Sequence, residues 1–120
     1  MAELTIVDFF GAGSSQSATE LRISKGGLAA LLASGGYTFV AGDANSVDEL
    51  IAAIACAGLI KLTPEARAID SVNRNVEFRY DPTVNYDSPT IDGQTFNRHT
   101  VEVAFYKPIP TPKLNPDDLK

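Results

Sequence analysis

Two segments of alternating apolar and polar residues dominate the second half of this chain. Residues 76–80 place Val, Phe and Tyr between Glu and Arg, and residues 100–105 alternate Val, Val and Phe with Thr, Glu and Ala. A period of two is typical of strands with one buried face. Between these segments, Asp92-Gly93 is flanked by Thr90-Ile91 and Gln94-Thr95, which favours a type I′ turn. The pattern predicts a long, protruding antiparallel hairpin.

Two prolines interrupt the first of the two strands of this hairpin. Pro82 follows Asp81 and Pro89 follows Ser88. Proline cannot donate to a strand ladder and is confined to edges, strand starts and bulges. We therefore expect a bent or edge strand here.

The clearest helix signal lies in the sequence SVDELIAAIACAG. Ser46 and Glu49 have the spacing of a capping box, and Gly58 has the position of a left-handed stop, so we expect a helix over 47–57. Its apolar residues form a broad stripe that should lie on a sheet. This stripe consists of Leu50, Ile51, Ile54 and either Cys56 or Ala57.

The first half contains shorter signals. Residues 4–10 are rich in β-branched and aromatic types, which predicts a strand followed by a flexible loop, GAGSSQSA. Leu21 and Ile23 alternate with polar residues and indicate a second strand that pairs with the first. Residues 28–33 could form two helical turns, and Thr63-Pro64-Glu65 resembles a further helix start whose length is left open.

These elements predict an α+β fold. It would consist of an antiparallel sheet or small sandwich of about four to six strands, with one main helix, at about residues 47–57, packed on one face. With 120 residues and 44% hydrophobic residues, the chain is large enough for one core. We expect a single globular domain over 1–106 and an extended, Pro-rich C-terminal arm over 107–120.

The composition argues against several partners. A net charge of −5 with scattered basic residues does not favour nucleic acid, which usually requires a basic face. No apolar run approaches the roughly 20 residues of a membrane span, and no signal-type segment begins the chain, so we expect no membrane contact and synthesis in the cytosol. A lone Cys56 cannot form an internal disulfide.

No catalytic or cofactor motif is convincing. Gly11 and Gly13 begin a dinucleotide-type loop, but Gln16 stands at the third glycine position and a strand follows. His99 is the only histidine and lacks ligand spacing around it. Cys56 lies within a helix among alanines, where a small buried residue is expected rather than an activated thiolate.

The carboxylates and serines lead to the same expectation. Three aspartates of the hairpin occupy turn positions without the alternation of a calcium loop: Asp81, Asp87 and Asp92. Three serines near the start have no base beside them in sequence: Ser14, Ser15 and Ser17. We expect no enzyme activity, no cofactor and no metal site.

Aromatic residues and the Pro-rich tail suggest an interface instead. Adjacent rings, as in Phe9-Phe10 and Phe105-Tyr106, must point to opposite faces of a strand, and outward rings are natural interface anchors. The tail cannot order itself and requires a surface to dock on. The predicted interface residues are Phe10, Tyr86, Phe96, Tyr106, Pro108, Pro110, Pro112, Leu114 and Leu119.

The segments LTIVDFFGAG, ELRISK and LIKLTPEA resemble small uncharacterised structural proteins of cyanobacterial tailed phages and prophages. The resemblance covers about the first half of the chain and carries over no functional residues. It implies a virion structural role, such as a capsid cement or decoration protein, or a small tail or neck component.

Two hypotheses follow. In the first, the chain is a virion assembly protein, made in the host cytoplasm, whose hairpin and tail bind further copies of itself or the major capsid or tail protein. In the second, it is a free-standing cytosolic binding module, either a small-molecule binder or a protein inhibitor. Its Gly-rich loop and hairpin would then form one site, and its tail would dock on its own domain.

Overall fold

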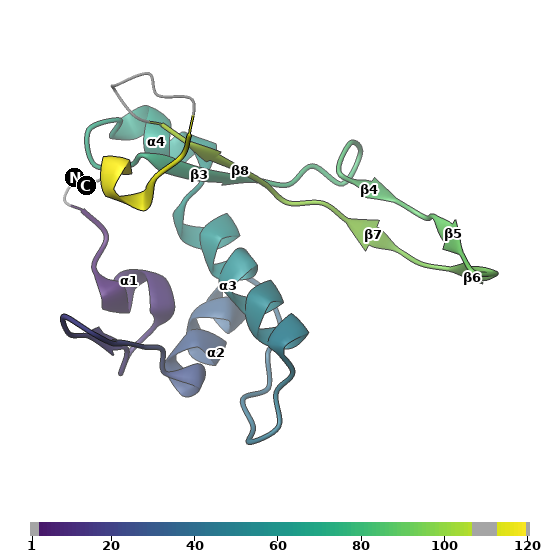
Figure 1. Cartoon of the computed structure of the whole chain (residues 1–120), viewed down its shortest axis with the longest axis horizontal. Coiled ribbons are helices and arrows are strands. Elements are labelled where there is room, and N and C mark those ends of the chain that lie inside the picture. Colours follow the sequence, from purple (N-terminus) through teal and green to yellow (C-terminus); the bar gives the residue numbers. More distant parts are fainter. Residues whose placement is uncertain (1–2, 107–112, 120) are drawn as a thin grey trace.

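The computed structural model describes residues 3–106 and 113–119, and predictions for Pro108, Pro110 and Pro112 fall outside this part. The described residues contain four α-helices and a short 3-10 helix (Figure 1). In chain order these are α1 (Ile6–Phe10), α2 (Lys25–Ser34), α3 (Val47–Lys61), α4 (Pro64–Ile69) and η1 (Pro116–Leu119).

The strands of the described part form two-stranded antiparallel ladders. The first ladder joins β1 (Ser15–Gln16) to β2 (Leu21–Arg22). The other three lie along one long hairpin (Figure 1). They join β3 (Val76–Arg79) to β8 (Glu102–Phe105), β4 (Tyr86–Asp87) to β7 (Arg98–His99), and β5 (Thr90–Ile91) to β6 (Gln94–Thr95). The expected α+β class with antiparallel pairing is confirmed, in the form of several small ladders.

The strand expected over residues 4–10 is wrong, because this segment contains helix α1. Thr5 caps the helix: its hydroxyl accepts from the Asp8 N–H at 3.1 Å, while the Thr5 N–H donates to the Asp8 carboxylate at 3.1 Å. This reciprocal capping box satisfies two backbone donors at the helix start. The local hydrogen bonds therefore outweigh the β-propensity of the segment.

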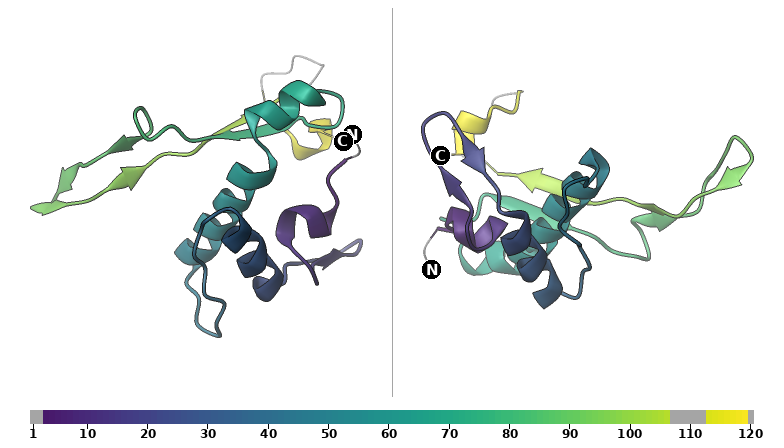
Figure 2. Two further views of the ribbon diagram at one scale, coloured as in Figure 1. Left: turned by 180° about the vertical axis from the view of Figure 1, so that it is seen from behind. Right: turned by 90° about the horizontal axis from the view of Figure 1, so that it is seen from below.

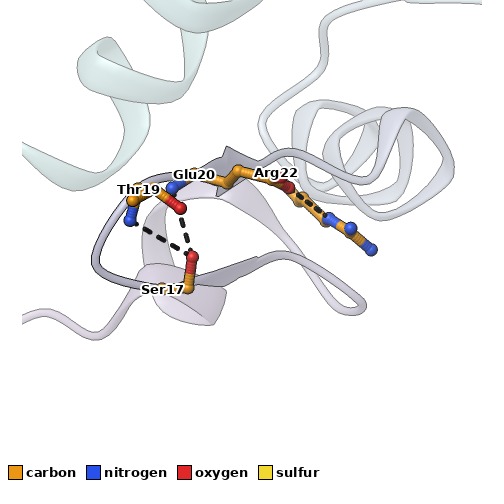
Figure 3. A network of polar contacts seen from close by, with 4 residues as sticks. All are labelled: Ser17, Thr19, Glu20 and Arg22. Atoms are coloured by element: carbon orange, nitrogen blue, oxygen red, sulfur yellow. Dashed lines mark hydrogen bonds and ion pairs between the residues drawn. The ribbon is translucent and has the colours of Figure 1, made fainter.

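The strand predicted around Leu21 is present, but its partner differs from the expected one. Leu21 pairs with Gln16 in the loop that was expected to be flexible. Ser17 closes the turn between the two strands, since its hydroxyl accepts from the N–H groups of Thr19 at 3.4 Å and Glu20 at 3.1 Å (Figure 3). Ser17 thus has a turn-forming role.

The core lies between α2 and α3. Leu28 and Leu32 of α2 are each 1% exposed, and Ala53 and Ala57 of α3 face them. Small side chains on α3 let the two helices approach closely, and partly buried apolar residues surround the contact. The two helical turns predicted at 28–33 are confirmed within a longer helix.

Helix α3 begins with the predicted capping box, but Gly58 does not end it. The helix continues to Lys61, with Leu62 as its C-cap. A Cβ at Gly58 would lie 2.5 Å from ring carbons of Phe78, so this glycine makes room for an aromatic ring. Ile51 is also not part of a buried stripe, because 62% of it is exposed.

Helix α4 begins at Pro64 after the Thr63 cap, as predicted, and extends to Ile69. It follows α3 closely and contacts strand β3. No helix in the part of the chain that the structure describes has the length and apolar character to cross a membrane.

The molecule is extended. Its radius of gyration is 16.1 Å, whereas a compact chain of this length would have about 13.6 Å. Its accessible surface is 8324 Å², against roughly 6,300 Å² for a typical monomer of this mass. The excess arises largely because the outer part of the hairpin projects away from the helical body (Figures 1 and 2).

Candidate interaction surface: the hairpin arm and the groove at its base

The projecting part of the hairpin consists of residues 81–100 and is called the arm. Its tip is a two-residue turn in which Asp92 has φ 52° and Gly93 has φ 79°. Positive φ at both central positions is the signature of a type I′ turn, so the predicted turn is confirmed. Thr90 lies opposite Thr95 and Ile91 opposite Gln94.

A loop bends the arm where it leaves the body. Arg79 pairs with Glu102 and Tyr86 with His99, so six residues (80–85) face two (100–101) across the hairpin. The Asp81 carbonyl accepts from the Asn85 N–H at 2.6 Å, and Pro82 lies within this loop. The bend predicted from Pro82 is therefore confirmed.

Polar contacts between the two strands stiffen the arm. Arg98 donates to both carboxylate oxygens of Asp87, with the Nε contact at 2.8 Å. Hydrogen bonding to Arg98 lowers the pKa of Asp87, and the same contact raises the pKa of Arg98. Tyr86 donates to Asn97 at 2.9 Å. These bonds hold the exposed strands in one register.

Several large apolar side chains on the arm lie in solvent. Among them, Val84 is 74% exposed, and Ile91, Phe96 and Tyr86 are also exposed. An isolated two-stranded hairpin is marginally stable in water, and exposed apolar groups rimmed by polar ones often mark protein interfaces. The arm is therefore a candidate docking element.

An apolar groove lies at the base of the arm, beside α3. It has a volume of about 490 Å³. Tyr80 and His99 line one side and are joined by a 2.6 Å contact between the Tyr80 hydroxyl and His99 Nδ1. The Tyr86 ring packs against His99 in a tilted arrangement, with ring centroids 4.9 Å apart. The rest of the lining comes from α3 (Ala52, Ala55, Cys56 and Leu59), together with Tyr37 and Val101.

The groove contains the only cysteine of the chain. Burial raises the pKa of the Cys56 thiol, so the protonated form dominates at neutral pH. Burial, followed by the nearby Cys56, also raises the pKa of Tyr37. The groove therefore presents a largely apolar lining in which Tyr80 and His99 are joined by a polar contact.

The other predicted interface residues are dispersed. Phe10 packs edge-to-face on Phe9 at 4.7 Å, on helix α1. Tyr106 is tied to its own body: its hydroxyl donates to Glu77 at 2.6 Å, which raises its pKa, and the Arg67 guanidinium lies 3.5 Å from its ring centre. Only Tyr86 and Phe96 lie on the arm.

The two leucines of the tail behave differently from each other. Leu114 is exposed, whereas Leu119 in η1 is partly buried. Leu119 lines a hollow together with Leu4, Leu62 and Val76 of its own chain. The end of the described tail therefore lies against the body.

The Gly-rich loop is a packing junction between α1 and α2. A Cβ at Gly11 would lie 2.2 Å from backbone atoms of Gly27, so only glycine fits this contact. Buried Ser14 donates to the Phe10 carbonyl at 3.3 Å and accepts from the Ser24 N–H at 3.0 Å. In residues 3–106 and 113–119, no group of three or more His, Cys, Asp or Glu residues is placed to hold a metal ion.

Sequence reasoning missed part of this surface. Val84 and Ile91 are more exposed than the predicted Tyr86 and Phe96, and Tyr37 lines the groove. Ile91 directly precedes the Asp92-Gly93 turn, and an apolar residue in such a position can be predicted from the sequence to lie at an exposed hairpin tip. Tyr37 lies far from the hairpin in sequence and gives no such signal.

No protein-family model, curated protein or solved structure was found to match this chain. The resemblance of its first half to phage structural proteins therefore stays a prediction.

Proposed function

We propose that this protein is a non-enzymatic structural assembly protein that attaches to a neighbouring subunit through its arm. The observation that carries this proposal is the arm itself: residues 81–100 project from the body with exposed apolar side chains at Val84, Ile91 and Phe96. This shape leaves apolar surface exposed to water in the isolated chain. Docking against a neighbour would bury that surface, which is favourable.

The physical properties of the arm suit this role. Its turn and cross-strand bonds fix its conformation before binding, which reduces the conformational entropy lost on docking. The apolar side chains would enter pockets of the neighbour, while the Asp87–Arg98 pair stays at the polar rim. In a symmetric particle, many copies of one modest contact give high avidity.

The particle we propose is a phage virion, in which the protein acts as a capsid cement or decoration protein. The resemblance of the first half to phage structural proteins supports this choice. The alternative within the virion is a small tail or neck component. The neighbour is then another copy of this chain or the major capsid or tail protein, and assembly takes place in the host cytoplasm.

The test is co-sedimentation with the particle. The double variant Ile91→Ser/Phe96→Ser should remain folded and lose most of its binding, because both side chains are exposed on the arm. The matched control is Val40→Ser/Val72→Ser, which removes two exposed apolar side chains outside the arm. Equal co-sedimentation of the two double variants would contradict the proposal.

The groove favours a second candidate function, a binding module for a small apolar molecule. Its volume of about 490 Å³ and the Tyr80–His99 pair suit an aromatic ligand that accepts or donates one hydrogen bond. Ala55→Leu would fill the groove and should abolish binding of an apolar fluorescent probe. The Gly-rich loop does not join this groove, because it lies beside α1 and α2 (Figure 1).

A further inference from the structure

Strand β8 has an open edge. The Tyr106 N–H donates to the Asn75 carbonyl at 2.8 Å, so residues 102, 104 and 106 direct their backbone groups toward β3. Because these directions alternate along a strand, the N–H and C=O groups of Val101, Val103 and Phe105 point the other way. Within the described residues, β3 is the only strand that pairs with β8.

The side chains at this edge are apolar and partly uncovered. Val103 is 41% exposed and Phe105 is 44% exposed. They lie on the same face of the ladder as Phe78, which packs against Gly58 of α3. Helix α3 thus covers this face over β3 and leaves it open over β8.

This edge lacks the usual protection against pairing. Soluble proteins guard open edges with charges, prolines or bulges, but the only charged residue between Val101 and Phe105 is Glu102. Its carboxylate accepts from the side chain of Asn85 at 3.0 Å and lies opposite Arg79. Residues 101–105 therefore direct no free charge at an approaching strand.

The opposite edge of the ladder is already capped. The Phe78 N–H points away from β8 and donates to the Leu62 carbonyl at 2.6 Å. This bond obstructs strand addition at the middle of β3 and leaves β8 as the open edge of the ladder. A two-fold contact between two such edges closes on itself and does not propagate into a fibre.

We propose that β8 pairs antiparallel with β8 of a second copy, centred on Val103. The residues whose backbone groups point outward must face one another across the two-fold axis. Three registers then pair Val103 with such a residue of the range 101–105, and they are centred on Glu102, Val103 and Ala104. Centring on Glu102 would place two carboxylates directly opposite each other, which is unfavourable. Centring on Ala104 would pair Val103 with Phe105 of the second copy and leave Val101 outside that contact.

Centring on Val103 uses the whole edge. Val103 then faces Val103 of the second copy, Val101 faces Phe105, and Glu102 faces Ala104. The backbone N–H and C=O groups of Val101, Val103 and Phe105 are then all hydrogen-bonded. The apolar face of the sheet continues across the interface, beneath both copies of α3. The result is a four-stranded sheet in the order β3-β8-β8-β3. This contact uses a different surface from the arm and does not depend on the proposed docking of the arm.

The register is tested by cross-linking in a Cys56→Ala background. In Val103→Cys, the two cysteines would lie opposite each other at about 5.5 Å between Cα atoms, which is within disulfide range. Oxidation should give a covalent dimer. The matched control is Val101→Cys, because the two copies of residue 101 would lie four residues apart along the strands and should not cross-link. Equal cross-linking of both variants would overturn the register.

The interface is tested without cysteines by sedimentation of the full chain. We expect the wild type to be a dimer at micromolar concentration and Val103→Lys to be a monomer with the same circular dichroism spectrum. Amide exchange at Val103 and Phe105 should slow as the wild-type concentration rises. A monomeric wild type would overturn the proposal. A dimer that persists in Val103→Lys but is lost in Ile91→Ser/Phe96→Ser would also overturn it, and would instead indicate self-docking by the arm.

Discussion

The helical body and the arm are held together by different means. In the body, Leu28 and Leu32 of α2 pack against the alanines of α3, and contacts between distant parts of the chain decide the arrangement. In the arm, the turn at Asp92-Gly93 and bonds between facing residues specify the shape, while most side chains remain in solvent. Changes in the body should therefore affect folding, whereas changes in the arm should affect what the folded protein binds.

The largest effect should come from a large-to-small change in the body. Leu32→Ala removes a side chain that is 1% exposed and should lower the free energy of unfolding by about 2–5 kcal/mol. The matched change in the arm, Ile91→Ala, removes an exposed side chain and should alter it by less than about 0.5 kcal/mol. Urea unfolding of both variants measures the difference. Similar losses would refute the division between body and arm.

A second effect distinguishes two roles for helix glycines. Gly58→Ala places a Cβ 2.5 Å from the Phe78 ring and should destabilise by about 1–3 kcal/mol through overpacking. Gly26→Ala in α2 is the control, because the nearest atom to its Cβ would be 4.0 Å away. It should stabilise the helix by up to about 1 kcal/mol. If Gly58→Ala were also stabilising, the close contact with Phe78 would not limit this position.

The sequence predicted those elements whose stabilising hydrogen bonds or turn conformations involve residues close together in the chain. The Ser46 cap, the Thr63-Pro64 helix start and the Asp92-Gly93 turn each depend on residues within a few positions of one another. For the same reason Thr5 and Asp8 could have revealed α1, since Thr-x-x-Asp matches a capping box. The β-branched composition of residues 4–10 obscured that signal.

Tertiary contacts were not predictable from the same sequence. The role of Gly58 depends on Phe78, which is twenty residues away, and the role of Gly11 depends on Gly27. The candidate surface was predicted only where it follows the hairpin, at Tyr86 and Phe96. The bond from Tyr106 to Glu77 is equally hidden in the sequence, because only the strand register brings these two residues close.

A moderate effect should appear as the pH falls. The backbone N–H of Ser46 hydrogen-bonds the Glu49 carboxylate and lowers its pKa in the folded protein. The stabilisation is therefore complete above the unfolded pKa, near 4, and is lost as the pH drops through the lower folded pKa. Glu49→Gln can still cap the helix but does not titrate here.

This prediction is checked by urea midpoints at pH 7 and pH 3. The wild type should be the more stable of the two at pH 7, and it should lose more stability than the variant between pH 7 and pH 3, because protonated Glu49 then resembles the neutral Gln. The bonds of Asp8 to Thr5 lower its pKa as well, so Asp8 also loses stabilisation in acid. Because Asp8 is present in both proteins, it does not contribute to the difference between them. An equal loss in the two proteins would show that the Glu49 cap does not contribute to the acid response.

The smallest global effect should come from the tip of the arm. Gly93 has φ 79°, a conformation that alanine adopts only with strain, so Gly93→Ala should disturb the turn. Because the arm contributes little buried surface, the urea midpoint should barely change. Amides near the tip should nevertheless exchange faster, among them Phe96, whose N–H donates to the Pro89 carbonyl at 2.9 Å. The same variant should weaken docking to a neighbouring subunit, since a preformed arm is what limits the entropy lost on binding. A lowered midpoint with unchanged exchange would mean that the arm and the body unfold as one unit, and the contrast between them would then be lost.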